Sequence, residues 1–448
     1  MRVLSALIFF PRGGSAHVAR ALATGLPDHG VEVSVLSGSR TDLHGHGDAR
    51  RFYAGLGPHV VDFTPALRSA DPMAAPVPMH PSFEDRPDAP DRIMAALDDE
   101  AFERQVASWS QALLEADAPG ADVLHLHHLT PINEAAERVA PDVPVVGHLH
   151  GTELLMLEAI EDGRGRWKHQ DAWAQRMRRW AVRCERIVLL SRSAEERAER
   201  LLGVDPARCL VLSNGFDPDA FAPRDVDRTR HWRRHLVDEP RGWRPGEPPG
   251  SVAYSAEQIA DLAGAAVLMS VGRFTEVKRT PLLIEAFAAA RERTRRPAAL
   301  VVVGGHPGEW EGEHPAETIE RIGARDVFLA GWHDHDELPA FLNASDVLAL
   351  ASVREQFGQV LVEGMACGIP PIAVDRFGPG EIVRDGETGW LVEPDDRDGL
   401  TEAIVAAIDD EDERRRRAEA ALADARAHYS WPALAGTLAT TLAEVARR

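Results

Sequence analysis

The residues with the clearest potential for chemistry are two glutamates, Glu355 and Glu363, which lie eight positions apart. The sequence places Glu355 in a loop after an apolar strand and Glu363 in a helix that begins near Phe357. At about 1.5 Å of rise per residue, the two are roughly 12 Å apart along the axis. The free N–H groups of the helix start lie between them and favour a diphosphate. A diphosphate ligand bound there could offer sugar hydroxyls to Glu355 and ribose hydroxyls to Glu363; the alternative is a helix with two solvated glutamates.

A second pair of candidates, Arg273 and Lys278, lies in a loop that follows an apolar strand in the second half of the chain. Ligands of open α/β sheets bind at the carboxyl ends of strands, where two cations would hold a phosphate and stabilise a departing nucleoside diphosphate. Lys278 is one of only two lysines in a chain with forty-eight arginines. That scarcity favours a chemical requirement for the lysine over two exposed basic residues in a loop.

Apolar runs and helical patterns alternate along both halves of the chain and supply the elements that must position these residues. Strands buried on both faces appear as continuous apolar runs, and helices between them produce a parallel, doubly wound sheet. We expect strands at residues 3–10, 31–36, 123–126, 143–147, 187–190, 265–271, 300–303, 327–329, 347–349 and 372–374, with helices at 15–26 and 281–290. The fold class is therefore α/β, with two Rossmann-like domains facing a central cleft.

The places where this pattern breaks suggest the domain boundaries. A proline-rich region at 216–264 precludes long regular elements, and Pro432 interrupts the helical C-terminal segment. We expect a first domain at 1–213, a linker with an insertion at 214–264, a second domain at 265–430 and a terminal helix at 431–448.

Composition limits the functional class. The 71 acidic and 50 basic residues give a formal charge of −21, which disfavours broad binding of nucleic acid. Three cysteines lie too far apart for a disulfide framework or a four-thiolate zinc site, and the apolar start lacks the features of a secretory signal. No stretch approaches the roughly 18 apolar residues of a membrane span. We expect a cytoplasmic protein.

Motifs along nearly the whole chain resemble those of the family-four retaining glycosyltransferases of GT-B fold. Each motif is weak by itself, but their order and spacing are specific. They are Pro11-Arg12-Gly13-Gly14, His29-Gly30-Val31-Glu32-Val33, the His-Gly segment from Pro144 to Glu153, Ser213-Asn214-Gly215-Phe216-Asp217, the segment from Arg354 to Pro370, and the loop from Gly378 to Gly389. The resemblance implies that the first domain binds the acceptor, that the second binds a nucleotide-sugar donor, and that the terminal helix crosses back to the first domain.

The resemblance also implies roles for individual residues. Arg273 and Lys278 would hold the donor diphosphate, Glu355 the donor sugar and Glu363 the ribose. Gly14 would let the first loop approach the diphosphate. The remaining donor contacts would come from the backbone of Phe357, Gly358, Gln359, Val360 and Leu361, with the base near Gly331 and Trp332.

Three positions depart from the family pattern. Phe377 stands where a glycine is common, Ala351 replaces a frequent proline, and Pro371 replaces the usual valine. These departures concern the shape of the donor-sugar pocket rather than the class of reaction.

Histidines gather near the ends of two predicted strands. By the resemblance, His150 faces the donor sugar and orients it; the alternative is a core histidine. A zinc site built from His125, His127, His128, His148 and His150 is conceivable, but no Asp or Cys completes a ligand set, and strand alternation sends His128 to the opposite side. We therefore predict no metal and expect these histidines to line the acceptor cleft.

Two other features suggest alternatives. Residues 164–186 combine basic residues with a stripe of Trp173, Met177, Trp180 and Cys184 at helical spacing, which favours a core-facing helix over contact with an anionic membrane surface. The Gly13-Gly14 pair lacks the full dinucleotide-binding glycine pattern, which disfavours a dehydrogenase.

The resemblance implies a retaining glycosyltransferase that moves a sugar from a nucleoside-diphosphate sugar, UDP first and GDP second, to an unidentified small-molecule or glycan acceptor. No cofactor is expected, and the reaction would depend on His150, Arg273, Lys278 and Glu355. One alternative is a sugar-nucleotide 2-epimerase of related architecture. Another is a sugar-nucleotide binding protein without catalysis.

Overall fold

The computed structural model describes residues 1–11, 13–43, 47–84, 89–164 and 166–447. Arg12 of the first glycine motif and Gly165 of the basic segment therefore lie outside the described residues. The chain divides into two compact units. The first comprises Met1–Asn214 and Trp431–Arg448, and the second is the continuous segment Gly215–Ser430.

The first unit is built on a seven-stranded parallel sheet with strand order β3-β2-β1-β4-β5-β6-β7. The central strands are buried on both faces because helices cover both, as a doubly wound sheet requires. The strands are β1 (Arg2–Leu7), β2 (Glu32–Ser39), β3 (Pro58–Asp62), β4 (Val123–His127), β5 (Val145–His148), β6 (Arg186–Leu189) and β7 (Cys209–Val211).

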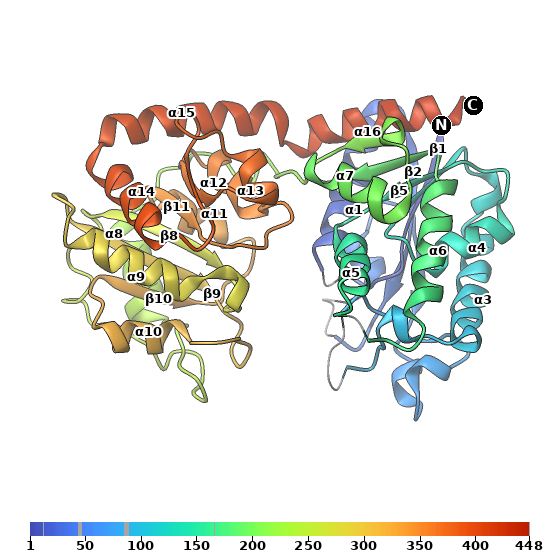
Figure 1. Ribbon diagram of the computed structural model, residues 1–448, viewed down its shortest axis with the longest axis horizontal. Helices are drawn as coiled ribbons and strands as arrows, with labels where there is room; N and C mark the ends of the chain where they lie inside the picture. Colours follow the sequence, from blue (N-terminus) through green and yellow to red (C-terminus); the bar gives the residue numbers. More distant parts are fainter. Residues whose placement is uncertain (12, 44–46, 85–88, 165, 448) are drawn as a thin grey trace. The chain divides into compact units, whose positions relative to one another are not determined.

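Helices connect these strands and pack against the sheet (Figure 1). Local sequence fixes where several of them begin: Asp98 caps α3 through a bond to the Ala101 N–H, and Thr130 with Pro131 starts α4. The helices are α1 (Gly14–Gly25), α2 (Ala49–Phe52), α3 (Asp99–Glu115), α4 (Pro131–Val139), α5 (Thr152–Glu161), α6 (Gln170–Arg183), α7 (Ser193–Leu202) and α16 (Trp431–Ala446).

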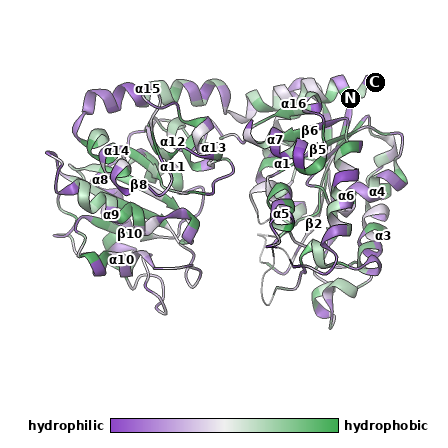
Figure 2. Ribbon diagram, in the orientation of Figure 1, coloured by the Kyte–Doolittle hydropathy of each residue, from purple (hydrophilic) through white to green (hydrophobic). Residues whose placement is uncertain are grey.

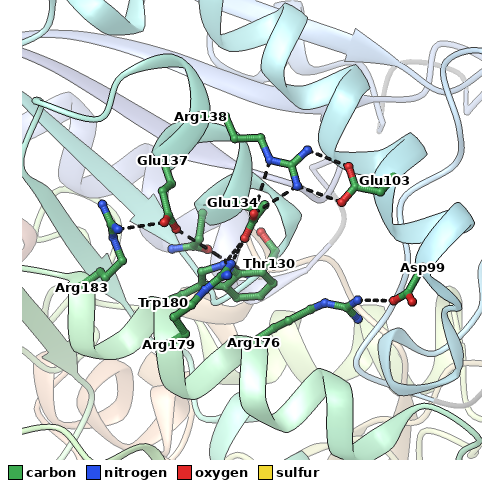
Figure 3. A network of polar contacts seen from close by, with 11 residues as sticks. Asp99, Glu103, Thr130, Glu134, Glu137, Arg138, Arg176, Arg179, Trp180 and Arg183 are labelled. Carbon is green, nitrogen blue, oxygen red and sulfur yellow. Dashed lines mark hydrogen bonds and ion pairs between the residues drawn. The ribbon is translucent and has the colours of Figure 1, made fainter.

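The basic helix α6 is joined to α3 and α4 by the polar network in Figure 3. The buried Glu134 carboxylate accepts a hydrogen bond from Trp180 Nε1 at 3.0 Å and pairs with Arg138 and Arg179. The predicted stripe is buried, because Trp173, Met177, Trp180 and Cys184 are each at most 2% exposed. The arginines beside this stripe pair with acidic residues of the same unit: Arg176 with Asp99, Arg179 with Glu134, and Arg183 with Glu137.

The terminal helix α16 packs against α1 and completes the core on one face of the first sheet. Its apolar residues Leu434, Leu438, Leu442 and Val445 are buried, and they lie in one hydrophobic cluster with residues of β1 and α1. The two helices approach closely, since a Cβ added to Gly25 would lie 2.6 Å from the Cβ of Ala435.

The second unit contains a six-stranded parallel sheet with strand order β10-β9-β8-β11-β12-β13. The strands are β8 (Ala266–Gly272), β9 (Ala298–Gly304), β10 (Val327–Gly331), β11 (Val347–Leu350), β12 (Pro371–Val374) and β13 (Trp390–Val392). The helices are α8 (Arg228–Arg233), α9 (Thr280–Arg291), α10 (Pro315–Ile322), α11 (Leu338–Asn343), α12 (Gln359–Ala366), α13 (Phe377–Ile382), α14 (Arg397–Asp409) and α15 (Glu411–His428). The strands are mainly hydrophobic, whereas α15 is largely hydrophilic (Figure 2). Both sheets match the predicted α/β fold class.

The proline-rich region predicted as linker and insertion is packed into the second unit. It carries α8 and one turn of π-helix, Arg234–Asp238, which bury Trp232 and Leu236 in the core. Farther along, Trp243 is buried and donates a hydrogen bond from Nε1 to the Gly305 carbonyl at 2.8 Å. This segment therefore helps to build the second unit and is more than a connection.

The chain enters and leaves the second unit at adjacent points. The N–H of Phe216 donates to the carbonyl of Tyr429 at 2.8 Å, and Phe216 forms a parallel bridge with Ser430. Across the part of the chain that the structure describes, no helix is long and apolar enough to cross a membrane.

Candidate functional site

Two of the predicted site residues, Lys278 and Glu355, form an ion pair in the second unit. Lys278 ends the turn that follows β8, and Glu355 lies in the loop between β11 and α12. The two loops are also joined through Val277, whose carbonyl accepts hydrogen bonds from the Val353 N–H at 3.0 Å and from the Ser352 hydroxyl at 3.2 Å. Both charged side chains are about one-fifth exposed, at 22% and 21%. The pair is thus held at the carboxyl end of the sheet, within reach of a ligand.

Arg273 lies on the same loop, between Gly272 and the buried Phe274. Its side chain is exposed and has no hydrogen bond or ion pair among the described residues. Because Phe274 packs against Trp243 and His314, the backbone that carries Arg273 is anchored. The guanidinium is therefore free to pair with an anion at this edge.

The strand ends beside Arg273 approach so closely that side chains cannot fit between them. Gly304 has φ +119°, and a Cβ there would lie 2.1 Å from the Gly272 carbonyl oxygen, which accepts a hydrogen bond from the Gly305 N–H. Gly331, at the end of β10, has φ +79°, and its Cβ would lie 2.0 Å from the Arg241 carbonyl. These glycines allow neighbouring main-chain segments to pack closely at the edge where ligands of α/β sheets bind.

Helix α12 begins at Gln359, two residues later than Phe357, where the sequence predicts its start. Gly358 caps it with φ +100°, a conformation that favours glycine, and a Cβ there would lie 2.9 Å from Leu361 Cδ1. A Cβ on Gly378 would meet the backbone of Phe357 at 2.3 Å. The first turn of α12, with its free N–H groups, is thus set by two glycines.

Glu363 points into the second unit and is only 2% exposed. Its Oε1 bonds with His335 Nε2 at 2.8 Å and accepts from Gln359 Nε2 at 3.0 Å; the same Gln359 nitrogen donates to the Gly215 carbonyl at 2.6 Å. The hydrogen bond to Glu363 raises the pKa of His335. His335 could not be recognised from the sequence, because nothing in its spacing connects it to a residue 28 positions away.

Trp332 and Phe377 lie on further loops of this unit. The Trp332 side chain is exposed, and its ring meets that of His306 edge-to-face with centroids 5.7 Å apart. Phe377 has φ +53°, so it occupies the left-handed region that favours glycine. The phenylalanine that replaces the family's common glycine is therefore held in a strained backbone conformation at the start of α13.

The first unit contributes Gly14 and His150. Gly14 is the first residue of α1, and a Cβ added to it would meet no atom within 4 Å. His150 follows β5 and precedes Gly151, whose φ of +89° turns the chain into α5. The N–H of His150 donates to Glu153 Oε2 at 3.2 Å.

Four further histidines surround His150, and all are buried: His125, His127, His128 and His148 are at most 3% exposed. His125 Nε2 bonds with His148 Nδ1 at 3.2 Å, and His127 Nδ1 bonds with His150 Nε2 at 3.0 Å. The sequence predicts that these histidines line the acceptor cleft, but their burial puts them in the interior of the first unit. The sequence cannot reveal it, because strand alternation gives the face of a side chain but not what covers that face.

His128 directly follows β4, and its ring centroid lies 4.5 Å from that of His150. Its φ is +67°, and its Nδ1 bonds with Glu153 Oε1 at 2.6 Å. Glu153 is fully buried at 0% exposure, so it is the polar centre around which the turn after β5 is built. Nothing in the sequence indicates that Glu153 belongs to this cluster.

The donor atoms of His125, His127 and His148 lie within 4.8 Å of one another, near the spacing that a metal ion requires. Histidines that bind zinc almost always donate their second ring N–H to a partner. His148 Nε2 is buried without a partner in the described part of the chain. The three rings stand near the spacing of a metal site, and the expectation that the protein holds no metal stays a prediction.

Burial should make this cluster sensitive to acid. Burial lowers the pKa of His125 to about 4 and holds the pKa values of His127, His148 and His150 well below 6.5. Between pH 6.5 and 4 these histidines bind protons in the unfolded chain but stay neutral in the folded protein. The free energy of unfolding should therefore fall as pH drops from 6.5 towards 4. Each ring contributes at most about 1.4 kcal/mol per pH unit. The free energy of unfolding, measured with urea, should depend less steeply on pH for His125→Leu than for wild type. The exposed control His306→Gln should show the wild-type slope.

Two family models match the chain. The model described as Glycosyltransferase Family 4 matches residues 12–220, and the model described as Glycosyl transferases group 1 matches residues 257–424. The two matches follow the two units of the structure.

Similar curated proteins are glycosyltransferases. A D-inositol 3-phosphate glycosyltransferase of Xylanimonas cellulosilytica is 26% identical over 94% of this chain and 98% of its own length. Glycogen synthase of Mycobacterium tuberculosis is 27% identical over 87% of this chain and 90% of its own length. D-inositol 3-phosphate glycosyltransferase 2 of Catenulispora acidiphila is 30% identical over 56% of this chain, and the match spans about half of that relative, 54%.

Solved structures with the same fold extend over both units. HepE of Anabaena, solved in complex with UDP and glucose, has a TM-score of 0.67 and 18% identity, and covers 99% of this chain and 100% of its own. Sucrose-phosphate synthase of Thermosynechococcus elongatus has a TM-score of 0.63 and 18% identity, and covers 99% of this chain and 98% of its own. With two family models matched along the sequence and two Rossmann-like units in the structure, the chain belongs to the GT-B glycosyltransferases of the family-four type.

Proposed function

We propose that this protein transfers a sugar from a nucleoside-diphosphate donor to an acceptor hydroxyl with retention of anomeric configuration. The observation that carries the proposal is the Lys278–Glu355 ion pair, held at a glycine-rich sheet edge beside the start of α12. A diphosphate would take over the lysine and leave the carboxylate to the sugar. UDP is the preferred donor nucleotide because HepE of the same fold was solved with UDP and glucose, and GDP is the second choice.

The donor would lie along the edge formed by the loops after β8, β10 and β11. Arg273 and Lys278 bind the diphosphate, and the main chain from Phe357 to Leu361 faces the phosphates and the sugar. Glu363 accepts the ribose hydroxyls in exchange for its present bond to His335. The exposed Trp332 ring offers a surface for the base.

In the reaction, the bond between the anomeric carbon and the diphosphate breaks while a bond to the acceptor oxygen forms, and the proton of the acceptor hydroxyl passes to the departing diphosphate. Negative charge then grows on the departing diphosphate, where fixed cations stabilise the transition state more than the ground state. Lys278 and Arg273 supply those cations. Gly14 and His150 belong to the first unit, and we assign them to the approach of the first loop and to orientation of the donor sugar.

A panel of nucleoside-diphosphate sugars tests this function, with thermal shift, donor hydrolysis and product structure as readouts. We expect a UDP-sugar to raise the melting temperature and to be slowly hydrolysed. With acceptor, proton NMR of the first-formed product should show the donor's α configuration, and a β-linked product would remove the retaining assignment. Conversion of the donor to its 2-epimer would favour an epimerase, and a thermal shift without turnover of any donor would favour a binding protein.

The two glutamates should differ in their kinetic effects. Glu363→Ala is expected mainly to raise the donor KM, because ribose contacts are alike in ground and transition states. Glu355→Ala should also lower kcat, because the sugar that it touches changes charge and shape during transfer. Initial rates at varied donor concentration measure both, with the exposed Glu419→Ala as the control. Equal defects in the two variants would contradict this division.

A further inference from the structure

The buried histidines of the first unit are connected in a definite order that ends at His150. Ser5 on β1 lies opposite β4, and its hydroxyl bonds with His127 Nε2 at 3.2 Å. His127 Nδ1 in turn bonds with His150 Nε2 at 3.0 Å. Ser5 and His127 are 2% and 1% exposed, so this row is shielded from water up to its last member.

The position of the His150 ring is fixed from three sides. Its main-chain N–H is held by Glu153, and Gly151 turns the chain away directly after it. The ring of His148 stacks on that of His150 with an interplanar angle of 5° and centroids 4.7 Å apart. His150 Nδ1 is the ring atom that has no hydrogen-bond partner among the described residues.

Two proton arrangements are compatible with these heavy-atom distances. In one, Ser5 donates to His127 Nε2, His127 Nδ1–H donates to His150 Nε2, and His150 carries its proton on Nδ1. In the other, every bond runs in reverse, and the buried Ser5 hydroxyl proton has no acceptor among the described residues. A buried hydroxyl that donates to nothing costs on the order of 1–3 kcal/mol. The first arrangement is therefore favoured.

We propose that Ser5 and His127 fix His150 as an Nδ1–H hydrogen-bond donor to a sugar oxygen of the bound substrate. In this arrangement the His150 Nε2 lone pair is already engaged by His127, so His150 does not act as a general base. Ser5 and His127 are positioning residues, since they act through His150. The identity of the recipient as a sugar rests on the proposed function, whereas the protonation pattern does not.

Nitrogen NMR of protein labelled with ¹⁵N-histidine tests the pattern without any substrate. At neutral pH we expect the His150 Nδ1 signal to be of the protonated, pyrrole type and the Nε2 signal to be of the pyridine type. The spectrum of His150→Gln identifies these signals by their loss. The reverse pattern in the folded protein would overturn the proposal.

Variants at Ser5 test whether its hydroxyl fixes the tautomer of His150. Ser5→Ala removes the hydroxyl that sets the direction, so the two tautomers of His150 should become mixed, whereas Ser5→Thr keeps the hydroxyl and should keep the wild-type signals. His125→Leu is a matched control. His125 lies on β4 with His127 and is equally buried, but it bonds with His148 instead of His150. An unchanged His150 tautomer in folded Ser5→Ala would overturn the role of Ser5.

Kinetics then link the pattern to sugar transfer. Ser5→Ala should reduce kcat/KM for the donor about five-fold, the equivalent of one net hydrogen bond, and Ser5→Thr should restore it. A failure to transfer sugar from any donor would refute the proposed function while the NMR pattern still decides the tautomer. A wild-type kcat/KM in Ser5→Ala with mixed tautomers would overturn the contact between His150 Nδ1–H and the sugar.

Discussion

Replacing Lys278 with alanine is expected to slow sugar transfer by about two orders of magnitude, the loss typical of removing one charge-stabilising group. The variant leaves Glu355 without its partner, so a carboxylate that is about one-fifth exposed would then face the donor diphosphate uncompensated. Repulsion should weaken donor binding while the missing cation lowers kcat. Initial rates at saturating donor and acceptor, with donor affinity from thermal shift, measure the two effects separately.

The chain contains its own matched control, because Lys168 is the other lysine and is exposed in the first unit. Lys168→Ala removes the same charge from the protein as a whole and should leave rate and affinity unchanged. Lys278→Arg keeps the charge but not the compact ammonium, so an intermediate rate is expected. Wild-type turnover in Lys278→Ala would refute the assignment of the lysine.

A second large effect is expected from Gly378→Ala. The added methyl would lie 2.3 Å from the Phe357 carbonyl oxygen and 2.4 Å from its Cα, so the backbone before α12 must move. Misplacement of reacting groups by about 1 Å costs on the order of a hundred-fold in rate, and we expect a loss of that size. Overpacking should also lower the free energy of unfolding by about 1–3 kcal/mol.

Gly264→Ala serves as the control for this variant. Its Cβ would lie 3.8 Å from the nearest atom, an ordinary contact, and Gly264 belongs to the same unit. Rates and urea unfolding should match wild type in this variant. If Gly378→Ala lost stability but kept full turnover, the backbone at Phe357 would have no part in placing the donor.

The long central strands could be predicted from the sequence because they are buried on both faces. The run that forms β9 is buried throughout, so its apolar character is uninterrupted. The strands β3, β7 and β13 were missed: the first is half-exposed at the sheet edge, and the other two have three residues each. A short edge strand is defined by its hydrogen bonds to a neighbour, which leave little trace in composition.

The candidate site could be predicted in its residue types but not in its contacts. Scarcity of lysine and the spacing of two glutamates identified Lys278, Glu355 and Glu363, yet the first two meet across 77 positions of sequence. His335 and Glu153 became visible only when folding placed each beside a charged or polar partner. Periodicity reports which face a residue occupies, whereas pairing between distant loops depends on the whole topology.

The bond between Phe216 and Tyr429 has a consequence for how such a protein can evolve. The second unit is one uninterrupted stretch, and the residues at its two ends are held side by side. Recombination could replace this stretch with a counterpart from another gene. The flanking segments would not have to become longer or shorter, because the two junctions are adjacent. The whole second unit can thus be exchanged as a single segment, while the flanking sequence, including α16, keeps its own core.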